Sequence, residues 1–147
     1  MMPLPKLTTY LKPGAQQSWR MPFEKAASLA QHPALKAFYS GLKLDEDLPL
    51  NGTPMLALDF ETTGLNPEYD DIISIGAIPM DLKRILLGQS RYWVLKPAAK
   101  LRADTIPIHG ITHSDIEQAP DLIDVFPDLL EMMTNRVVVA HCAGIES

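Results

Sequence analysis

Two acidic residues, Asp59 and Glu61, stand at the end of an apolar run near the middle of the chain. The run, MLALDF at residues 55–60, is almost continuously apolar, which is typical of a strand covered on both faces. Residues two apart on a strand point to the same side, so both carboxylates face one spot. Like charges repel there unless a hard divalent cation such as Mg2+ or Mn2+ lies between them. We therefore predict a metal site at the end of this strand.

A turn of small residues follows the two acids. Thr62, Thr63 and Gly64 would let a substrate backbone come close, with hydroxyl and N–H groups free to bond phosphate or sugar. The plain alternative is a solvated strand end with ordinary turn residues. An isolated Asp-x-Glu would favour that alternative, but the Thr-Thr-Gly-Leu that follows a buried strand favours a functional site.

Charge is distributed unevenly along the 147 residues, whose net charge is −5. Residues 1–54 carry six Lys and Arg against four Asp and Glu, whereas residues 55–147 carry seven against fourteen, a net charge of −7. This acidic part would handle nucleic acid only where divalent metals neutralise its carboxylates. With 46% hydrophobic and 21% charged residues, the composition is that of an ordinary globular domain and excludes disordered and collagen-like classes.

The expected location is the cytoplasm. No apolar run approaches the roughly 20 residues needed to cross a bilayer, so we expect no membrane partner, and the first residues lack the apolar block of a secretory signal. Cys142 is the single cysteine, which excludes an internal disulfide and suits a reducing compartment.

The first third of the chain predicts a helical N-terminal extension. Residues 33–42 place apolar side chains on one helical face, and residues 23–31 predict a second helical piece. We favour an extension that covers part of the next domain, and a partner-binding helix is the alternative. The acidic stretch at 44–54, with two prolines, predicts a linker. The expected division is residues 1–51 for the extension and linker and residues 52–147 for an α/β domain.

Four strands and a long helix are predicted in that domain. Short connections favour antiparallel neighbours among the first three strands, and a crossover helix would make the last strand parallel to an earlier one. Pro127 interrupts the helix, either kinking it or marking its first turn. Ser114 and Glu117 fit a capping box of a shorter helix. The expected strands are residues 55–60, 72–78, 91–95 and 137–140, with the long helix within residues 121–135.

Three stretches together resemble the DEDD-type 3'-5' exonucleases, the superfamily of the epsilon proofreading subunit of bacterial DNA polymerase III. LDFETTGL resembles the first motif, IHGIT (108–112) resembles a His-Gly-Ile segment that follows it, and VVVAHCAGIE (137–146) resembles the second motif. The resemblance covers residues 55–146. It implies a ribonuclease H-like fold, a mixed sheet with flanking helices.

The resemblance also implies roles for individual residues. Asp59, Glu61 and Glu146 match metal ligands, which hold two Mg2+ or Mn2+ ions in a complete relative. Cys142 replaces the usual Asn of the second motif, Ile145 replaces an aromatic residue, and Glu146 replaces an aspartate. The implied substrate contacts are Thr62, Thr63, Gly64, Leu65, His109 and Ile145.

The implied activity is metal-dependent hydrolysis of phosphodiester bonds at nucleic-acid 3' ends, with DNA favoured over RNA. Proofreading, repair and nucleotide turnover all remain open, with a polymerase or another replication or repair protein as the expected partner. The third motif of the family, a histidine and an aspartate, has no counterpart between Glu146 and Ser147. We therefore expect the domain to be C-terminally incomplete, poorly stable, and weakly active or inactive alone. The alternative is a binding module that kept the fold and lost catalysis.

Overall fold

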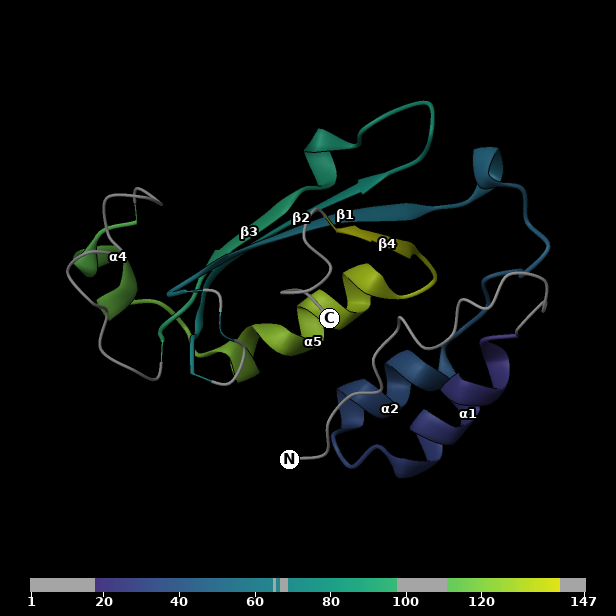
Figure 1. Cartoon of the computed structure of the whole chain (residues 1–147), viewed down its shortest axis with the longest axis horizontal. Coiled ribbons are helices and arrows are strands. Elements are labelled where there is room, and N and C mark those ends of the chain that lie inside the picture. Colours follow the sequence, from purple (N-terminus) through teal and green to yellow (C-terminus); the bar gives the residue numbers. More distant parts are fainter. Residues whose placement is uncertain (1–17, 65, 67–68, 98–110, 141–147) are drawn as a thin grey trace.

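The structure is a computed structural model that describes residues 18–64, 66, 69–97 and 111–140. Figure 1 shows a twisted sheet with a long helix, α5, against it and two helices, α1 and α2, farther from the sheet. No helix within these ranges is long and apolar enough to cross a membrane. In chain order the elements are α1 (Arg20–Leu29), α2 (Pro33–Ser40), η2 (Leu50–Gly52), β1 (Met55–Thr62), β2 (Ile72–Met80), η3 (Leu87–Gln89), β3 (Arg91–Val94), α4 (His113–Glu117), α5 (Leu122–Met133) and β4 (Val137–Ala140).

The four strands form one mixed sheet in the order β3-β2-β1-β4. β1 pairs antiparallel with β2, and β2 pairs antiparallel with β3, as the short connections predict. β4 returns after α5 and pairs in parallel with β1, which confirms the expected crossover. The fold class predicted from the sequence, a mixed sheet with flanking helices, is therefore confirmed.

One face of the sheet packs against α5 and holds the main core. Alternate residues of β1 point to this face, and Leu56, which is fully buried, lies at its centre. Full burial of a leucine contributes roughly 2 kcal/mol to the free energy of folding. Because this face holds the larger of the two buried clusters, it contributes more apolar stabilisation than the other face. The core cluster comprises Leu56, Leu58, Ile75, Ala77, Leu95, Val125 and Leu129.

A β-bulge changes the direction of side chains near the end of β1. Glu61 pairs with Ser74 but Thr62 pairs with Ile72, so one residue of β2 is extra. Ile72 and Ile75 pack against the main core, whereas Ile73 joins a second cluster with Ile111, Ile116 and Val94. The second cluster therefore lies on the face of the sheet opposite the main core, near the end of β1. Ile116 of α4 belongs to this cluster, so α4 packs against the sheet there.

Pro127 lies inside α5, six residues into the helix. Of the two alternatives that the sequence leaves open, a first-turn position is therefore excluded. Pro127 is exposed, so its ring does not displace the core. Its missing N–H leaves the carbonyl of Ile123 without the usual helical donor, and the buried residues Val125, Leu129 and Leu130 hold the helix in place.

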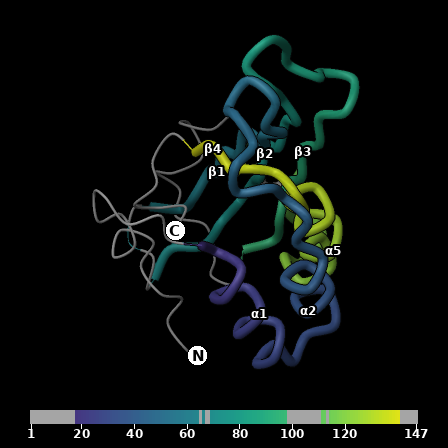
Figure 2. Tube along the Cα trace, turned by 90° about the vertical axis from the view of Figure 1, so that its right-hand side faces the viewer, coloured from purple at the N-terminus to yellow at the C-terminus, as the bar shows by residue number. Residues whose placement is uncertain are grey.

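Of the two N-terminal helices, α2 packs against α5, and α1 packs against α2 (Figure 2). The rings of His32 and Phe126 lie edge to face with centroids 5.8 Å apart. The backbone N–H of Lys43 donates to the Asn135 side chain, and Asn135 has a left-handed φ of 57° in the turn after α5. α2 and the residues after it thus contact α5 and the turn that follows α5, whereas a separate helical extension stays a prediction. The division at residue 52 stays a prediction.

Glu46, in the predicted linker, bonds to the two residues that precede α1. Its carboxylate accepts hydrogen bonds from the Ser18 hydroxyl at 2.6 Å and from the Trp19 backbone N–H at 2.9 Å. These bonds, with the hydroxyl of Ser18 first, hold the pKa of Glu46 below its usual value. Glu46 therefore attaches the segment after α2 to the start of α1, through a charge at the positive end of α1.

The capping box of α4 lies two residues earlier than the sequence predicts. Thr112 is the N-cap residue, its hydroxyl accepts from the Asp115 backbone N–H, and the Asp115 carboxylate accepts from the Thr112 N–H at 2.8 Å. The prediction of Ser114 and Glu117 is wrong because both lie inside the helix. The Thr112 hydroxyl is the main cause that lowers the pKa of Asp115.

Candidate active site

Asp59 and Glu61 lie on one face of the sheet, near the carboxyl end of β1. They alternate with Leu58 and Phe60, which pack into the main core on the opposite face. Asp59 pairs across the sheet with Gly76, and Glu61 pairs with Ser74. The side chain of Asp59 is exposed, while Glu61 is half-buried. The structure therefore brings the two predicted carboxylates to the same side, as the two-residue period of a strand requires.

The end of β4 lies beside these two acids. Ala140, the last residue of β4, pairs with Leu58, the residue before Asp59. Because β1 and β4 are parallel, their carboxyl ends meet at the same edge of the sheet. The chain thus leaves β4 next to the strand end that carries the acids. Four of the predicted site residues, Leu65, His109, Ile145 and Glu146, lie outside the described residues.

The turn after the acids is held together by Asp70, which the sequence reasoning did not single out. One carboxylate oxygen of Asp70 accepts from the Thr63 hydroxyl at 3.1 Å, and the other accepts from the Asn66 backbone N–H at 2.9 Å. The Thr63 hydroxyl in turn accepts from the Asp71 N–H at 2.9 Å, and the Thr63 N–H donates to the Asp71 carbonyl. Asp70 therefore fixes both sides of the turn. The sequence does contain a signal for this role, because Asp is a common turn residue and Asp70 stands at the end of the loop, seven residues after Thr63.

Gly64 is required at its position by the same carboxylate. A side chain there would place its Cβ only 2.7 Å from the Asp70 Cγ and Oδ1 atoms, well inside van der Waals contact. The turn therefore accommodates glycine because the Asp70 carboxylate fills the space that a Cβ would need. Gly64 thus has a structural role besides the substrate role that the motif implies.

The hydroxyl groups of the turn point inward, contrary to the expectation that they would be free for substrate. The Thr62 hydroxyl donates to the Gly64 carbonyl at 2.6 Å, and the Thr63 hydroxyl bonds Asp70 and Asp71. A hydroxyl that bonds its own turn fixes the local backbone. Any contact of this turn with a substrate would then come chiefly from backbone groups, held in place by these two threonines.

The donor set fits a hard divalent cation. Asp59 and Glu61 supply carboxylate oxygens, and Mg2+ is commonly held by one or two carboxylates together with water and substrate phosphate oxygens. Within the described ranges no group of three or more His, Cys, Asp or Glu side chains comes together to hold a metal. The described part of the candidate site therefore comprises two carboxylates, one exposed and one half-buried.

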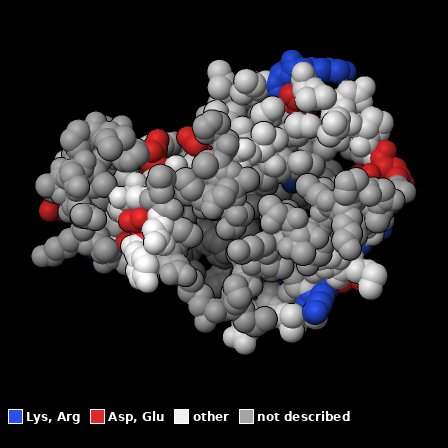
Figure 3. All heavy atoms as spheres, in the orientation of Figure 1, with Lys and Arg blue, Asp and Glu red and all other residues white. Residues whose placement is uncertain are grey.

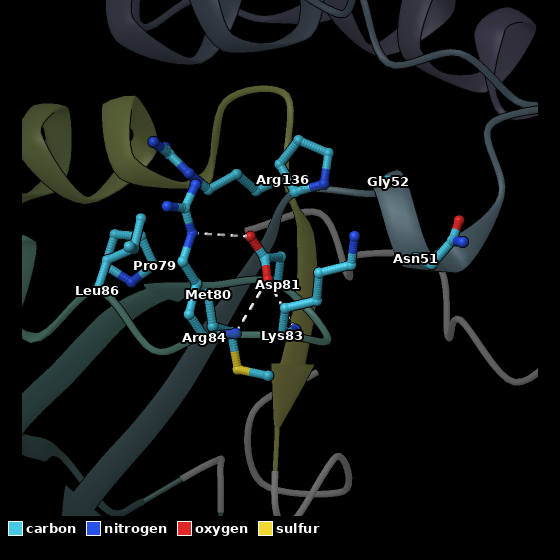
Figure 4. A pocket seen from close by; sticks show the side chains of 10 residues that line it. Asn51, Gly52, Pro79, Met80, Asp81, Lys83, Arg84, Leu86 and Arg136 are labelled. Atoms are coloured by element: carbon cyan, nitrogen blue, oxygen red, sulfur yellow. Dashed lines mark hydrogen bonds and ion pairs between the residues drawn. The ribbon is translucent and has the colours of Figure 1, made fainter.

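A second feature, an open hollow of about 510 Å3, lies at the opposite end of β1. Figure 4 shows Lys83, Arg84 and Arg136 around it, with Asp81 bonded to the Arg84 side chain at 3.3 Å. The backbone N–H of Lys83 is the main cause that lowers the pKa of Asp81, and Arg84 adds to it. The hollow lies before the first residue of β1, and Asp59 and Glu61 are the fifth and seventh residues of that strand, so the acids do not line the hollow.

The face shown in Figure 3 carries basic and acidic side chains in separate small groups. No continuous basic surface crosses the described part of this face.

The comparisons with known proteins agree with this geometry. The model of the RNase_T family, described as exonuclease, matches residues 56–145. The chain belongs to this exonuclease family. The matched residues begin in β1 just before the two acids and end beyond β4, so the family match includes Asp59 and Glu61 and ends one residue before Glu146.

Curated relatives of this exonuclease-family chain are bacterial replication proteins. DNA polymerase III PolC-type of Thermotoga petrophila is 32% identical over 103 residues, which are 70% of this chain and 7% of that protein. DNA polymerase III subunit epsilon of Buchnera aphidicola is 32% identical over 101 residues, 65% of this chain and 43% of that protein. The chain thus spans less than a tenth of the first relative and less than half of the second.

Solved structures share the fold. Exonuclease X in complex with 5' overhanging duplex DNA has a TM-score of 0.53 at 23% identity and covers 63% of this chain and 51% of that one. Cell-death related nuclease 4 has a TM-score of 0.53 at 21% identity, and the match covers 61% of this chain and 35% of that one. At such identities the likeness extends to the fold, which confirms the predicted ribonuclease H-like architecture.

Proposed function

We propose that this exonuclease-family chain contributes to a metal-dependent 3'-5' exonuclease that shortens DNA from its 3' ends. The observation that carries the proposal is the placement of Asp59 and Glu61 on one face at the end of β1, beside a turn fixed by Asp70. The relatives named as DNA polymerase III proteins support DNA as the substrate and a polymerase as the partner.

The third metal ligand in this proposal is Glu146. β4 ends beside Leu58, and Glu146 is the sixth residue after Ala140. A chain of six residues spans at most about 20 Å, so Glu146 has the reach to approach Asp59. The position of Ile111 bears on the proposed role of His109. Ile111 packs against Ile73, and Ile73 is next to Ser74, which pairs with Glu61. His109, two residues before Ile111, would thereby lie near the substrate.

Bound Mg2+ or Mn2+ would supply an activated water and stabilise the charge of the leaving 3' oxygen. The residues of the chain have separate tasks. Asp59 and Glu61 hold the cation through their carboxylates, and the turn from Thr62 to Leu65 presents backbone groups to the terminal sugar and phosphate. Since the family's third motif has no counterpart among these 147 residues, we expect them to hydrolyse DNA weakly or not at all by themselves.

The test compares Asp59→Asn with Asp128→Asn. Asp128 is an exposed aspartate of α5, on the helix that packs against the opposite face of the sheet, so its substitution is a matched control. Binding of Mn2+ is measured by electron paramagnetic resonance, and a 5'-labelled single-stranded DNA is followed for products shortened from the 3' end. We expect Asp59→Asn to weaken Mn2+ binding by at least about tenfold, because a direct ligand contributes no less than its supporting neighbours. The control should bind as the native chain does.

The outcomes separate the two candidate functions. Mn2+ binding that depends on Asp59, with even slow 3' shortening, supports the exonuclease. DNA binding with no metal response would instead support a binding module that lost catalysis. If Asp59→Asn leaves Mn2+ affinity unchanged, the metal site proposed here is wrong.

A further inference from the structure

Three residues lie in a row across the face of the sheet that carries the acids. Asp59 of β1 pairs with Gly76 of β2, and Gly76 pairs with Tyr92 of β3. Directly opposed residues in a sheet point to the same face. The order across the strands is therefore a carboxylate, a position without a side chain, and an aromatic ring.

Gly76 leaves a gap that the fold itself does not need. A Cβ at this position would meet only the Asp59 carbonyl oxygen and the Tyr92 Cδ2 atom, both at 4.0 Å, which is ordinary van der Waals contact. Its backbone is also outside the left-handed region that favours glycine. Since glycine weakens a strand interior, neither packing nor backbone conformation accounts for it. The gap keeps open the space between Asp59 and the Tyr92 ring.

Tyr92 is exposed on this face. Its relative exposure is 62%, whereas the other aromatic residues of the sheet, Phe60 and Trp93, pack against the main core on the opposite face. One edge of its ring borders the position of Gly76, since Cδ2 lies 4.0 Å from where a Cβ would be. An exposed ring of this kind offers a flat apolar surface for stacking.

We propose that Tyr92 is a stacking platform for a nucleobase of the DNA strand whose 3' end lies at Asp59 and Glu61, with Gly76 leaving room for the sugar between them. The inference rests on the function proposed above. Two spacings between neighbouring strands place Tyr92 about 10 Å from Asp59. A backbone phosphate held at the acids would thus have a base within reach of the ring. Stacking is tolerant of base identity, since every base has a π-face, and this suits an enzyme that removes any nucleotide.

A different explanation for Tyr92 is purely structural, because an aromatic side chain can shield a glycine on a neighbouring strand. The two explanations differ in what a substitution changes. A shielding role predicts a loss of stability that does not depend on the ligand. A stacking role predicts a loss of affinity only when the ligand has a base to stack.

The experiment measures binding of a 5'-fluorescein single-stranded DNA by anisotropy, in Mn2+, with phosphorothioate linkages that resist hydrolysis. A second strand of equal length lacks the bases of its three 3'-terminal nucleotides. The variants are Tyr92→Leu, which keeps an apolar cover over Gly76, Tyr92→Phe, which keeps the ring, and Gly76→Val, which fills the gap. Leu87→Ala, at an exposed position between β2 and β3, is the control.

We expect Tyr92→Leu to weaken binding of the intact strand by about 5- to 100-fold, the range for one lost base stack. Tyr92→Phe and the control should stay within about twofold of the native chain, and Gly76→Val should weaken binding without a lower melting temperature. The abasic strand should bind equally to the native chain and to Tyr92→Leu. Equal effects of Tyr92→Leu on both strands, or none on the intact strand, would overturn the stacking role. If instead the native chain binds neither strand, or binds both regardless of Asp59→Asn, the proposed function itself fails.

Discussion

Gly64→Ala is a direct test of the contact that shapes the turn beside the acids. The new Cβ would lie 2.7 Å from the Cγ and Oδ1 atoms of Asp70 and closer still to Oδ2. The carboxylate must therefore rotate away. That movement breaks the hydrogen bond from the Thr63 hydroxyl at 3.1 Å and the bond from the Asn66 N–H at 2.9 Å.

The expected loss follows from those two bonds. Hydrogen bonds to a charged group contribute about 1.5 to 3 kcal/mol each, and solvent replaces part of that in a half-exposed turn. We therefore expect Gly64→Ala to lower the free energy of unfolding by about 2 kcal/mol. For a chain of this size the melting temperature should fall by roughly 4 to 8 °C.

A double-mutant cycle with Asp70→Ala isolates the contact. Free energies of unfolding are measured by urea denaturation for the native chain, both single variants and the double variant. Once the carboxylate is absent, Gly64→Ala should be neutral or stabilise by up to about 1 kcal/mol, because alanine restricts the unfolded chain. An equal loss in both backgrounds, or a gain in the native background, would refute the account of Gly64.

Three further predictions concern the core, the long helix and the linker. Leu56→Ala, at the fully buried centre of the core, should lower the free energy of unfolding by about 2 to 5 kcal/mol in urea denaturation, and a loss below about 1 kcal/mol would contradict its central position. Pro127 is exposed inside α5, and Pro127→Ala should raise the free energy of unfolding by about 1 to 3 kcal/mol because the missing helical hydrogen bond is restored. An unchanged melting temperature would refute this. Because the folded-state pKa of Glu46 is lowered, its support of α1 is present above the usual glutamate pKa and is lost as pH falls through the lowered value. The hydrogen-exchange protection factors of α1, in which the slower intrinsic exchange at lower pH is divided out, should therefore fall on acidification in the native chain, and Glu46→Gln should remove that fall.

The sequence by itself determined the strands, their pairing directions and the position of the two acids. These follow from local rules: apolar runs of strand length, short connections between antiparallel neighbours, and a period of two that puts Asp59 and Glu61 on one face. The long helix also follows from its spacing of apolar residues, although the place of Pro127 within it does not.

Only the tertiary structure decided which distant residues complete the neighbourhood of the acids. The parallel pairing of β4 with β1 puts Ala140 beside Leu58, the bulge turns Ile73 toward Ile111, and the register aligns Gly76 and Tyr92 with Asp59. Asp70 becomes the centre of the turn through hydrogen bonds across a folded loop. The physical reason is that strand register and loop closure depend on pairing and packing between segments far apart in the chain, whereas periodicity reports only which way neighbouring side chains point.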